Sequence, residues 1–159
     1  ALCLKRDIKV KSKKIIYIDM DDVICNYSEA FNKALEESPK MLFPQSQYGF
    51  FANLKPIKKA IESVSKFLAS NDYETYFLTA PSIRNPFSYT EKRVWIENHF
   101  GYSAVEKMII CSNKGLLKGD ILIDDNAHGK GQESFEGRLM HFGSNEFPNW
   151  ESITNELSV

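Results

Sequence analysis

Two pairs of aspartates have the spacing expected of a metal-dependent site. Asp19 and Asp21 come directly after the apolar run Ile15–Ile18, and Asp124 and Asp125 end a second apolar run. Such short, β-branched runs are typical of buried parallel strands, whose carboxyl ends meet at one edge of a sheet. Carboxylates gathered there repel one another unless a cation lies among them, and ligands that are all oxygens suit Mg²⁺. The two pairs therefore predict a magnesium site.

A hydroxyl and an ammonium group extend this set. Thr79 ends a third apolar run, and Lys114 follows a fourth. Lys114 and Mg²⁺ would neutralise a phosphoryl group, so that Asp19 could attack phosphorus and form an aspartyl-phosphate. Asp21 would protonate the leaving oxygen and then accept a proton from water, a role that predicts a raised pKa. Thr79 would donate a hydrogen bond to a phosphoryl oxygen.

Each of these residues also has an ordinary structural explanation. An aspartate after a strand usually caps a turn or a helix, and a threonine before Ala80-Pro81 suits a turn. A single lysine is most often a solvated side chain. The joint placement of all these groups at four strand ends favours a functional site.

The elements that must position these side chains alternate along the chain. Strands are predicted at residues 13–19, 74–78, 107–111, 120–124 and 138–142, and helices at 27–37, from Pro56 to about 68, 89–100, around 114–117 and 150–157. Strands that alternate with helices indicate an α/β fold, a three-layer sandwich around a Rossmann-like parallel sheet.

The stretch Met41–Pro56 is aromatic-rich and has no clean period, so we expect it to belong to a small insertion after the first strand. The predicted organisation is a basic N-terminal tail (1–14), a core (15–25 and 57–159) and a small cap (26–56). The rings and Met41 of the cap could stack on a planar ligand or pack the cap onto the core. Other aromatics have core-like spacing, namely Phe31, Phe67, Phe77 and Trp95.

Composition excludes several classes of protein. The 159 residues include 20 Lys and Arg against 21 Asp and Glu, so the net charge predicts no attraction to nucleic-acid polymers. No run approaches the ~20 apolar residues needed to span a membrane. Three widely spaced cysteines favour a reducing compartment, so we expect a cytoplasmic protein. A homodimer is compatible with the sequence.

These residues resemble the haloacid dehalogenase (HAD) superfamily of phosphatases in type and order. More closely, the chain is similar to the 5'(3')-deoxyribonucleotidases. The similarity is carried by Ile18-Asp19-Met20-Asp21, by Gly49 to Ile57, by Glu91 to Glu97, and by Asn113-Lys114 leading to Gly119 to Asp125. It spans most of the chain.

The resemblance implies a role for each acidic residue. Asp19 is expected to be the nucleophile and Asp21 the acid and base. Asp19, the backbone carbonyl of Asp21, and Asp125 are expected to hold Mg²⁺, with Asp124 in a supporting position. The sequence differs from the family pattern at Asp22, where glycine is usual.

The resemblance also implies how a substrate would be held. Thr79, Lys92 and Lys114 are expected to contact its phosphate, and Tyr27 to lie against a nucleobase. Phe51 lies in the segment that returns from the cap, where a further ring would close the pocket. The expected substrate is thus a small phosphate ester, a (deoxy)nucleoside monophosphate.

Two alternatives follow from the same residues. The short cap is also compatible with a HAD phosphatase of sugar phosphates or other small metabolites. A phospho-accepting receiver-type signalling domain combines similar residue types but places its acidic pair after the first strand and its accepting aspartate later. Here Asp19 and Asp21 follow the first strand and the adjacent pair comes late.

Overall fold

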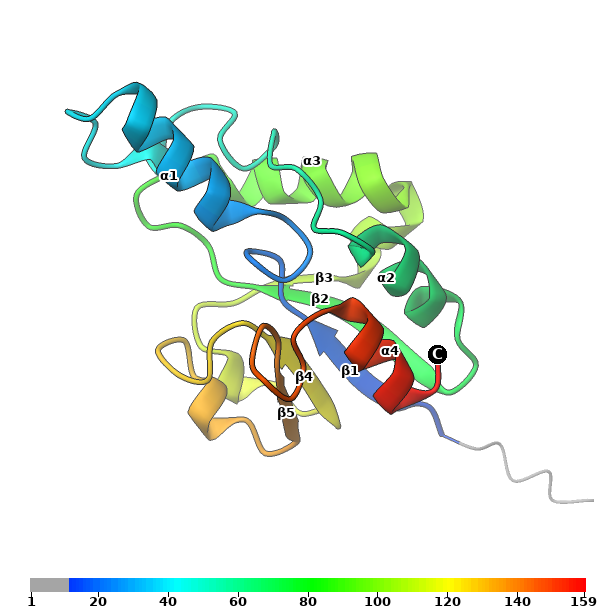
Figure 1. The fold of residues 1–159 in the computed structure, drawn as a ribbon. Helices are drawn as coiled ribbons and strands as arrows, with labels where there is room; N and C mark the ends of the chain where they lie inside the picture. Colours follow the sequence, from blue (N-terminus) through cyan, green and yellow to red (C-terminus); the bar gives the residue numbers. More distant parts are fainter. Residues whose placement is uncertain (1–11) are drawn as a thin grey trace, which may run out of the picture.

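The computed structural model describes residues 12–159 (Figure 1), so most of the predicted basic tail lies outside the described residues. The strands are β1 (Lys14–Ile18), β2 (Tyr73–Thr79), β3 (Met108–Ile110), β4 (Ile121–Asp124) and β5 (Arg138–His141). The α-helices are α1 (Tyr27–Glu37), α2 (Ala60–Ala69), α3 (Ser88–Phe100) and α4 (Trp150–Leu157). Four short 3-10 helices are η1 (Pro44–Ser46), η2 (Tyr102–Lys107), η3 (Lys114–Leu116) and η4 (Gln132–Ser134).

The five strands form one parallel sheet in the order β3-β2-β1-β4-β5. Ile18 at the end of β1 pairs with Phe77 of β2 and with Ile123 of β4. This register brings Asp19 level with Asp124, because each follows one member of the pair Ile18 and Ile123. The predicted α/β class and Rossmann-like parallel sheet are confirmed.

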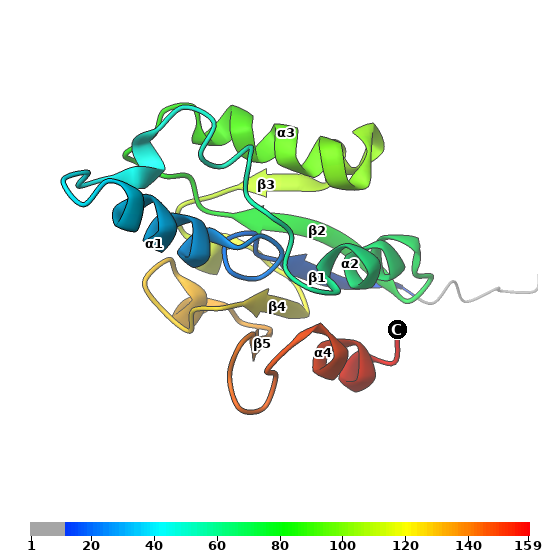
Figure 2. The ribbon, with the colours of Figure 1, turned by 45° about the horizontal axis from the view of Figure 1, so that its top comes forward.

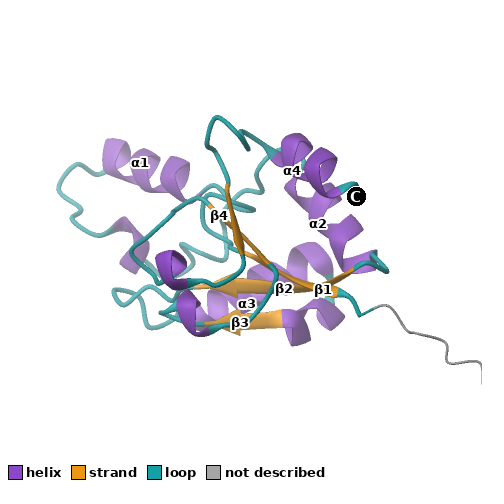
Figure 3. Ribbon diagram, turned by 90° about the horizontal axis from the view of Figure 1, so that it is seen from below, coloured by secondary structure: helices purple, strands orange, loops and turns teal. Residues whose placement is uncertain are grey.

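One face of the sheet carries the main core. The side chains of Ile16, Ile18 and Phe77 point to this face and pack with residues of α2, α3 and α4 in a single buried cluster. The helices α2 and α4 lie side by side over the sheet (Figure 3), where Phe67 contacts Trp150. Three helices thus cover this face and bury its apolar side chains, which stabilises the fold.

The opposite face of the sheet is covered by short 3-10 helices and loops and not by the expected layer of α-helices. Tyr17, Leu78 and Leu122 form its buried cluster with Phe135, which directly follows η4. The third layer thus consists of η3, η4 and their loops. Side chains alternate along a strand, so Asp19 and Asp124 share the side of Tyr17 and Leu122.

Two local expectations are wrong. The helix after the insertion begins at Ala60 and not at Pro56, because Pro56 pairs with Cys25 and Lys59 takes a left-handed backbone (φ 68°). Phe31 is not a core residue: it is half-buried on α1, 5.9 Å from the ring of Tyr27. Phe67, Phe77 and Trp95 are fully buried as expected.

The inserted segment after β1 lies beyond the carboxyl ends of the strands (Figure 2). It contains α1 and η1 joined by turns, and none of the residues of α1 is fully buried. Within residues 12–159, no helix combines the length and apolar character that crossing a bilayer requires.

Candidate active site

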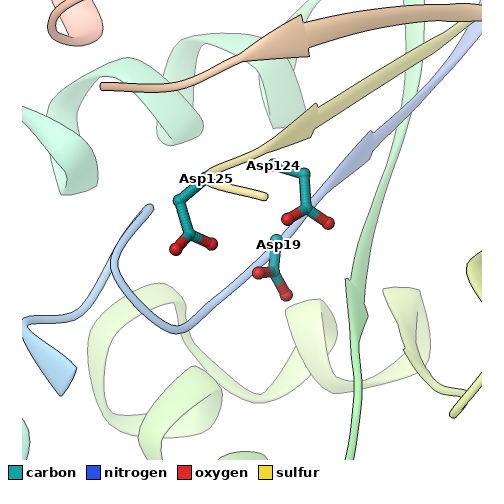
Figure 4. Close-up of side chains that lie close together, drawn as sticks. All are labelled: Asp19, Asp124 and Asp125. Atoms are coloured by element: carbon teal, nitrogen blue, oxygen red, sulfur yellow. The ribbon is translucent and has the colours of Figure 1, made fainter. Parts of the chain in front are cut away.

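Three carboxylates converge at the carboxyl edge of the sheet (Figure 4). Asp19 follows β1, Asp124 ends β4, and Asp125 is the next residue. One oxygen from each lies within 4.8 Å of the other two. Asp19 and Asp124 are buried and Asp125 is half-buried, which makes their mutual repulsion strong. The predicted acidic cluster is therefore present, and it draws on two neighbouring strands.

Lys114 of η3 lies between two of these acids. Its Nζ is 2.8 Å from Oδ1 of Asp19 and 2.5 Å from Oδ2 of Asp124, and the side chain is fully buried. Burial lowers the pKa of Lys114, but Asp19 and Asp124 together outweigh it and leave that pKa above its ordinary value. Lys114 is thus a permanent cation at the point where a phosphoryl group would carry negative charge.

The hydrogen bonds of Asp124 are already made. In addition to the hydrogen bond from Lys114, its carboxylate accepts hydrogen bonds from the side-chain amide nitrogen of Gln132, at 3.2 and 3.3 Å, and from the backbone N–H of Asn126, at 2.9 Å. Burial and the neighbouring Asp19 raise its pKa, while Lys114 lowers it. Asp124 is therefore oriented to hold Lys114.

Asp125 differs from Asp124 in having a carboxylate oxygen that makes no hydrogen bond within the described residues. Its Oδ1 is buried and accepts no hydrogen bond from any residue of the described chain. Burial first, then Asp19, Asp124 and Asp22, raises the pKa of Asp125 to about 8. An unpaired buried oxygen among three carboxylates fits a hard divalent cation, which would replace the missing partner and offset the repulsion. Asp19 and Asp125 fit the ligand role better than Asp124 does.

The buried side chain of Lys92 forms an ion pair with the carboxylate of Asp21. The Nζ of Lys92 donates to Oδ2 of Asp21 at 2.7 Å, to the Thr79 hydroxyl at 2.7 Å and to the Ala80 carbonyl at 2.8 Å. These three bonds use all three ammonium protons. Burial raises the pKa of Asp21, and Lys92 partly offsets it. The raised pKa expected of an acid and base is confirmed in direction.

Two aromatic rings stand above these groups. Tyr27, the first residue of α1, lies 6.0 Å from Phe51 with the rings nearly parallel. Phe51 is buried, and Nζ of Lys92 lies 5.1 Å from its centroid. Burial, with Asp21 and Asp22, raises the pKa of Tyr27 to about 12, so its hydroxyl stays protonated. The pair provides an apolar wall next to the carboxylates.

The returning strap of the insertion, residues 45–51, is tied to the core by two buried polar side chains. Glu91 of α3 accepts hydrogen bonds from the backbone N–H groups of Gly49, at 2.7 Å, and Phe51, at 2.9 Å. Asn85 donates to the backbone carbonyls of Gln45, at 3.0 Å, and Gln47, at 3.3 Å. The position of the Phe51 ring therefore depends on α3 and on the loop that precedes it.

These groups surround a cleft of about 540 Å³. Its wall includes Asp19, Asp21, Lys114 and Asp125 at one end and Tyr27 and Phe51 from the insertion. Thr79 and Lys92 are not part of this wall: both are buried behind Asp21. The structure thus brings all the residues singled out from the sequence together and distributes them over the cleft wall and the layer behind it.

Three supporting residues were not singled out from the sequence. Gln132, Glu91 and Asn85 are buried polar side chains. Glu91 and Asn85 bond to residues of the insertion, whereas Gln132 bonds to Asp124 of β4. Glu91 adjoins Lys92 within one of the segments that resemble the deoxyribonucleotidases, which was the one available signal. Gln132 follows a glycine-rich turn, a common loop feature that points to no specific role.

The fold matches that of a solved HAD hydrolase. The crystal structure of YfnB from Bacillus subtilis, bound to magnesium, superposes with a TM-score of 0.62 over 94% of this chain and 100% of that one. The two sequences are 10% identical, so this likeness concerns the fold alone.

Curated relatives are similar over about two thirds or more of the chain. A protein of Vibrio phage KVP40, provisionally named a 5'(3')-deoxyribonucleotidase, is 32% identical over 158 residues, covering 94% of this chain and 88% of its own. The 5'(3')-deoxyribonucleotidase of Bacillus subtilis is 29% identical over 175 residues, covering 91% and 99%. The cytosolic human 5'(3')-deoxyribonucleotidase is 33% identical over 105 residues, which are 66% of this chain and 46% of that protein.

A family profile gives the same assignment. The profile described as "5' nucleotidase, deoxy (Pyrimidine), cytosolic type C protein" matches residues 36–150, which include α2, α3, Lys114 and the pair Asp124-Asp125. The expected likeness to HAD phosphatases, and within them to phosphoric monoester hydrolases of the 5'-nucleotidase type, is confirmed. The chain belongs to the family of 5'-deoxynucleotidases of cytosolic type C.

Proposed function

We propose that the protein is a magnesium-dependent phosphatase that hydrolyses deoxynucleoside monophosphates to nucleoside and phosphate through an aspartyl-phosphate on Asp19. One observation carries the proposal: Lys114 and the unpaired oxygen of Asp125 flank Asp19 within a single cleft. Family membership supports the nucleotide phosphatase part, and the geometry supports the nucleophile.

Asp19, Asp125 and the backbone carbonyl of Asp21 would hold Mg²⁺, with Asp124 in support. When bound, Mg²⁺ supplies positive charge that makes the phosphoryl group a better electrophile. Lys114 adds a second positive charge from the protein itself and pairs with Asp19, so that an anionic nucleophile can approach an anionic phosphate.

In the first step, a carboxylate oxygen of Asp19 forms a bond to phosphorus while the bond from phosphorus to the ester oxygen breaks. The proton of Asp21 passes to that leaving oxygen, and the nucleoside departs with a hydroxyl group. The raised pKa of Asp21 supports this role, because a carboxyl that keeps its proton can act as an acid.

In the second step, water attacks the phosphorus of the aspartyl-phosphate and Asp21 accepts its proton. The bond between phosphorus and Asp19 breaks, which restores the carboxylate and releases inorganic phosphate. Lys92 touches the carboxylate of Asp21 in the structure and so favours the deprotonated form that this step needs.

The remaining expected residues would serve the substrate. We propose that residues 26–56 act as a cap, with Tyr27 and Phe51 against the base, and that Thr79, Lys92 and Lys114 contact phosphate. For Thr79 this requires that its hydroxyl donate to phosphate in place of the Ala80 carbonyl, 3.4 Å away. For Lys92 it requires that one of its three present hydrogen bonds be exchanged for one to phosphate. A cytoplasmic location and a homodimer remain predictions.

The test is a substrate panel measured with Mg²⁺: deoxynucleoside 5'- and 3'-monophosphates beside sugar phosphates. We expect preference for the nucleotides, and loss of activity by at least about 1000-fold in Asp19→Asn. An exposed acid on α1, Glu36, provides the control Glu36→Gln. Preference for sugar phosphates would replace the nucleotide part by the metabolite alternative, and an active Asp19→Asn would refute the mechanism.

A further inference from the structure

Gln45 of the insertion lines the cleft and carries a polar atom without a partner among the described residues. Gln45, in η1, lines the cleft, and its amide oxygen Oε1 is buried yet accepts no hydrogen bond from any residue in the described range 12–159. The only other buried side-chain atom there of which this is true is Oδ1 of Asp125. A buried acceptor without a donor costs free energy, so such atoms are retained where a ligand supplies the donor.

A hydrogen bond and the preceding proline restrict the backbone of Gln45. Its carbonyl accepts a hydrogen bond from Asn85 at 3.0 Å, and Asn85 is fully buried. The preceding residue, Pro44, is buried and has a restricted backbone. The Gln45 side chain therefore starts from a fixed point of the backbone at the cleft wall, which is the arrangement a specific contact needs.

No side chain within residues 12–159 donates a hydrogen bond to this oxygen. Arg84, one of the cations of the cleft wall, precedes Asn85 and lies over the ring of Phe43, 3.8 Å from its centroid. Gln45 also belongs to the insertion, whereas the carboxylates and Lys114 belong to the sheet edge. The two groups approach the cleft from different elements, so one ligand can touch both.

We propose that Gln45 is a specificity-determining residue that recognises the nucleobase. Its Oε1 accepts a hydrogen bond from a ring or exocyclic N–H at the edge of the base, while Tyr27 and Phe51 contact the base faces. This inference rests on the proposed function, because it requires a substrate that carries a base. A sugar phosphate has no such N–H and gains nothing from Gln45.

The experiment compares Gln45→Met with the wild type on deoxynucleoside monophosphates and on 2-deoxyribose 5-phosphate. Methionine keeps the length of the side chain and removes the acceptor. We expect kcat/KM for the nucleotides to fall about tenfold, mainly through KM, with turnover of 2-deoxyribose 5-phosphate unchanged. Unchanged turnover of the base-free substrate also shows that the variant is folded.

Gln47→Met is the matched control. Gln47 lies two residues further on, its carbonyl is also held by Asn85, and its side chain is exposed and outside the cleft wall. We expect this variant to match the wild type on every substrate. Equal activity of Gln45→Met and wild type on nucleotides, or an equal loss on both kinds of substrate, would overturn the inference. If the wild type itself prefers 2-deoxyribose 5-phosphate, the proposed function fails and the inference fails with it.

Discussion

The carboxylate of Asp22 accepts two hydrogen bonds from Ser28, one from its backbone N–H at 2.8 Å and one from its hydroxyl. Ser28 is the second residue of α1, and the residue that directly precedes this helix, Asn26, makes no side-chain capping bond. Asp22 thus caps α1 from six residues upstream. It also has a left-handed backbone (φ 58°), which aspartate tolerates better than most residues. Asp22, at the position where the resemblance implies a glycine, thus ties the loop after β1 to the insertion.

Replacement of Asp22 by alanine should therefore cost stability twice, through the lost cap and through the left-handed backbone. We expect a loss of roughly 1–2 kcal/mol in urea unfolding. Asp22→Asn keeps both an acceptor and the tolerance of this backbone, so its loss should stay below that of Asp22→Ala. Equal stability of Asp22→Ala and wild type would show that the cap contributes nothing.

Lys92 offers a test of how Asp21 is tuned. Its ammonium group lowers the pKa of Asp21 against the larger effect of burial. Lys92→Gln removes that charge, so the pKa of Asp21 should rise and the acidic limb of the pH–rate profile should move to higher pH. We expect kcat to fall up to about 100-fold. The exposed Lys33 of α1 supplies the control Lys33→Gln, which should leave the profile in place.

The acidic limb would remain unshifted in Lys92→Gln if Lys92 served phosphate alone, because KM would then rise without a change in the pH dependence of kcat. The two roles expected for Lys92 are thus separable in one titration.

Asp125 makes the metal-free protein sensitive to pH. Its pKa is raised to about 8 in the folded state, against about 3.9 when unfolded. The folded state therefore binds the extra proton between these values, and stability falls as pH rises towards 8. We expect Tm in EDTA to drop by at least about 3 °C between pH 6 and pH 8, which corresponds to roughly 1 kcal/mol.

Mg²⁺ should reverse this trend, since a cation favours the charged carboxylates and stabilises the state that binds it. Asp125→Asn should flatten the pH dependence and abolish the effect of Mg²⁺ on Tm. A pH-dependent Tm that persists in Asp125→Asn would assign the effect to another group.

Substitution of two glycines near Lys114 can distinguish the effect of backbone strain from that of a steric clash. Gly129 and Gly131 both have positive φ, 98° and 83°, so alanine at either is strained. At Gly129 a Cβ would meet nothing within 4 Å, whereas at Gly131 it would lie 1.9 Å from Oδ1 of Asn113, the residue before Lys114. We expect Gly129→Ala to cost about 1 kcal/mol with normal kcat, and Gly131→Ala to cost more and to lower kcat.

Unfolding curves and kcat for both variants decide the matter. If Gly131→Ala retains full kcat, the turn that contains Gly131 does not position Lys114.

The sequence predicts the fold well where local pattern and tertiary structure agree. The bounds of Tyr27–Glu37 and Trp150–Leu157 agree residue for residue, because each helix has a strong apolar period. The start of α2 could not be predicted from Pro56, since that segment pairs with Cys25, a contact invisible in local spacing. Nor could the thin third layer, because 3-10 turns lack a recognisable period.

The candidate site shows the same division. Asp19, Thr79, Lys114 and Asp124 were predictable because parallel strands end at one edge. The partners of Gln45 and Glu91 were not, since their hydrogen bonds join segments about 40 residues apart. A buried glutamine or glutamate has no local signature that separates it from a solvated one.

The thin layer over β1 and β4 has a consequence for how this enzyme can change. Lys114 and Gln132 stand on single turns with few internal hydrogen bonds, and both are anchored by the same carboxylate, that of Asp124. Lys114, Gln132 and Asp124 therefore depend on one another, and a substitution at any one of them disturbs the other two. The residues 45–51 are anchored through their backbone, to Asn85 and Glu91, so a side chain there that is not buried, such as that of Gln45, can change without loss of the anchor. Substitutions among residues 45–51 can therefore change the substrate range, while the residues around Asp124 on the other wall of the cleft stay the same.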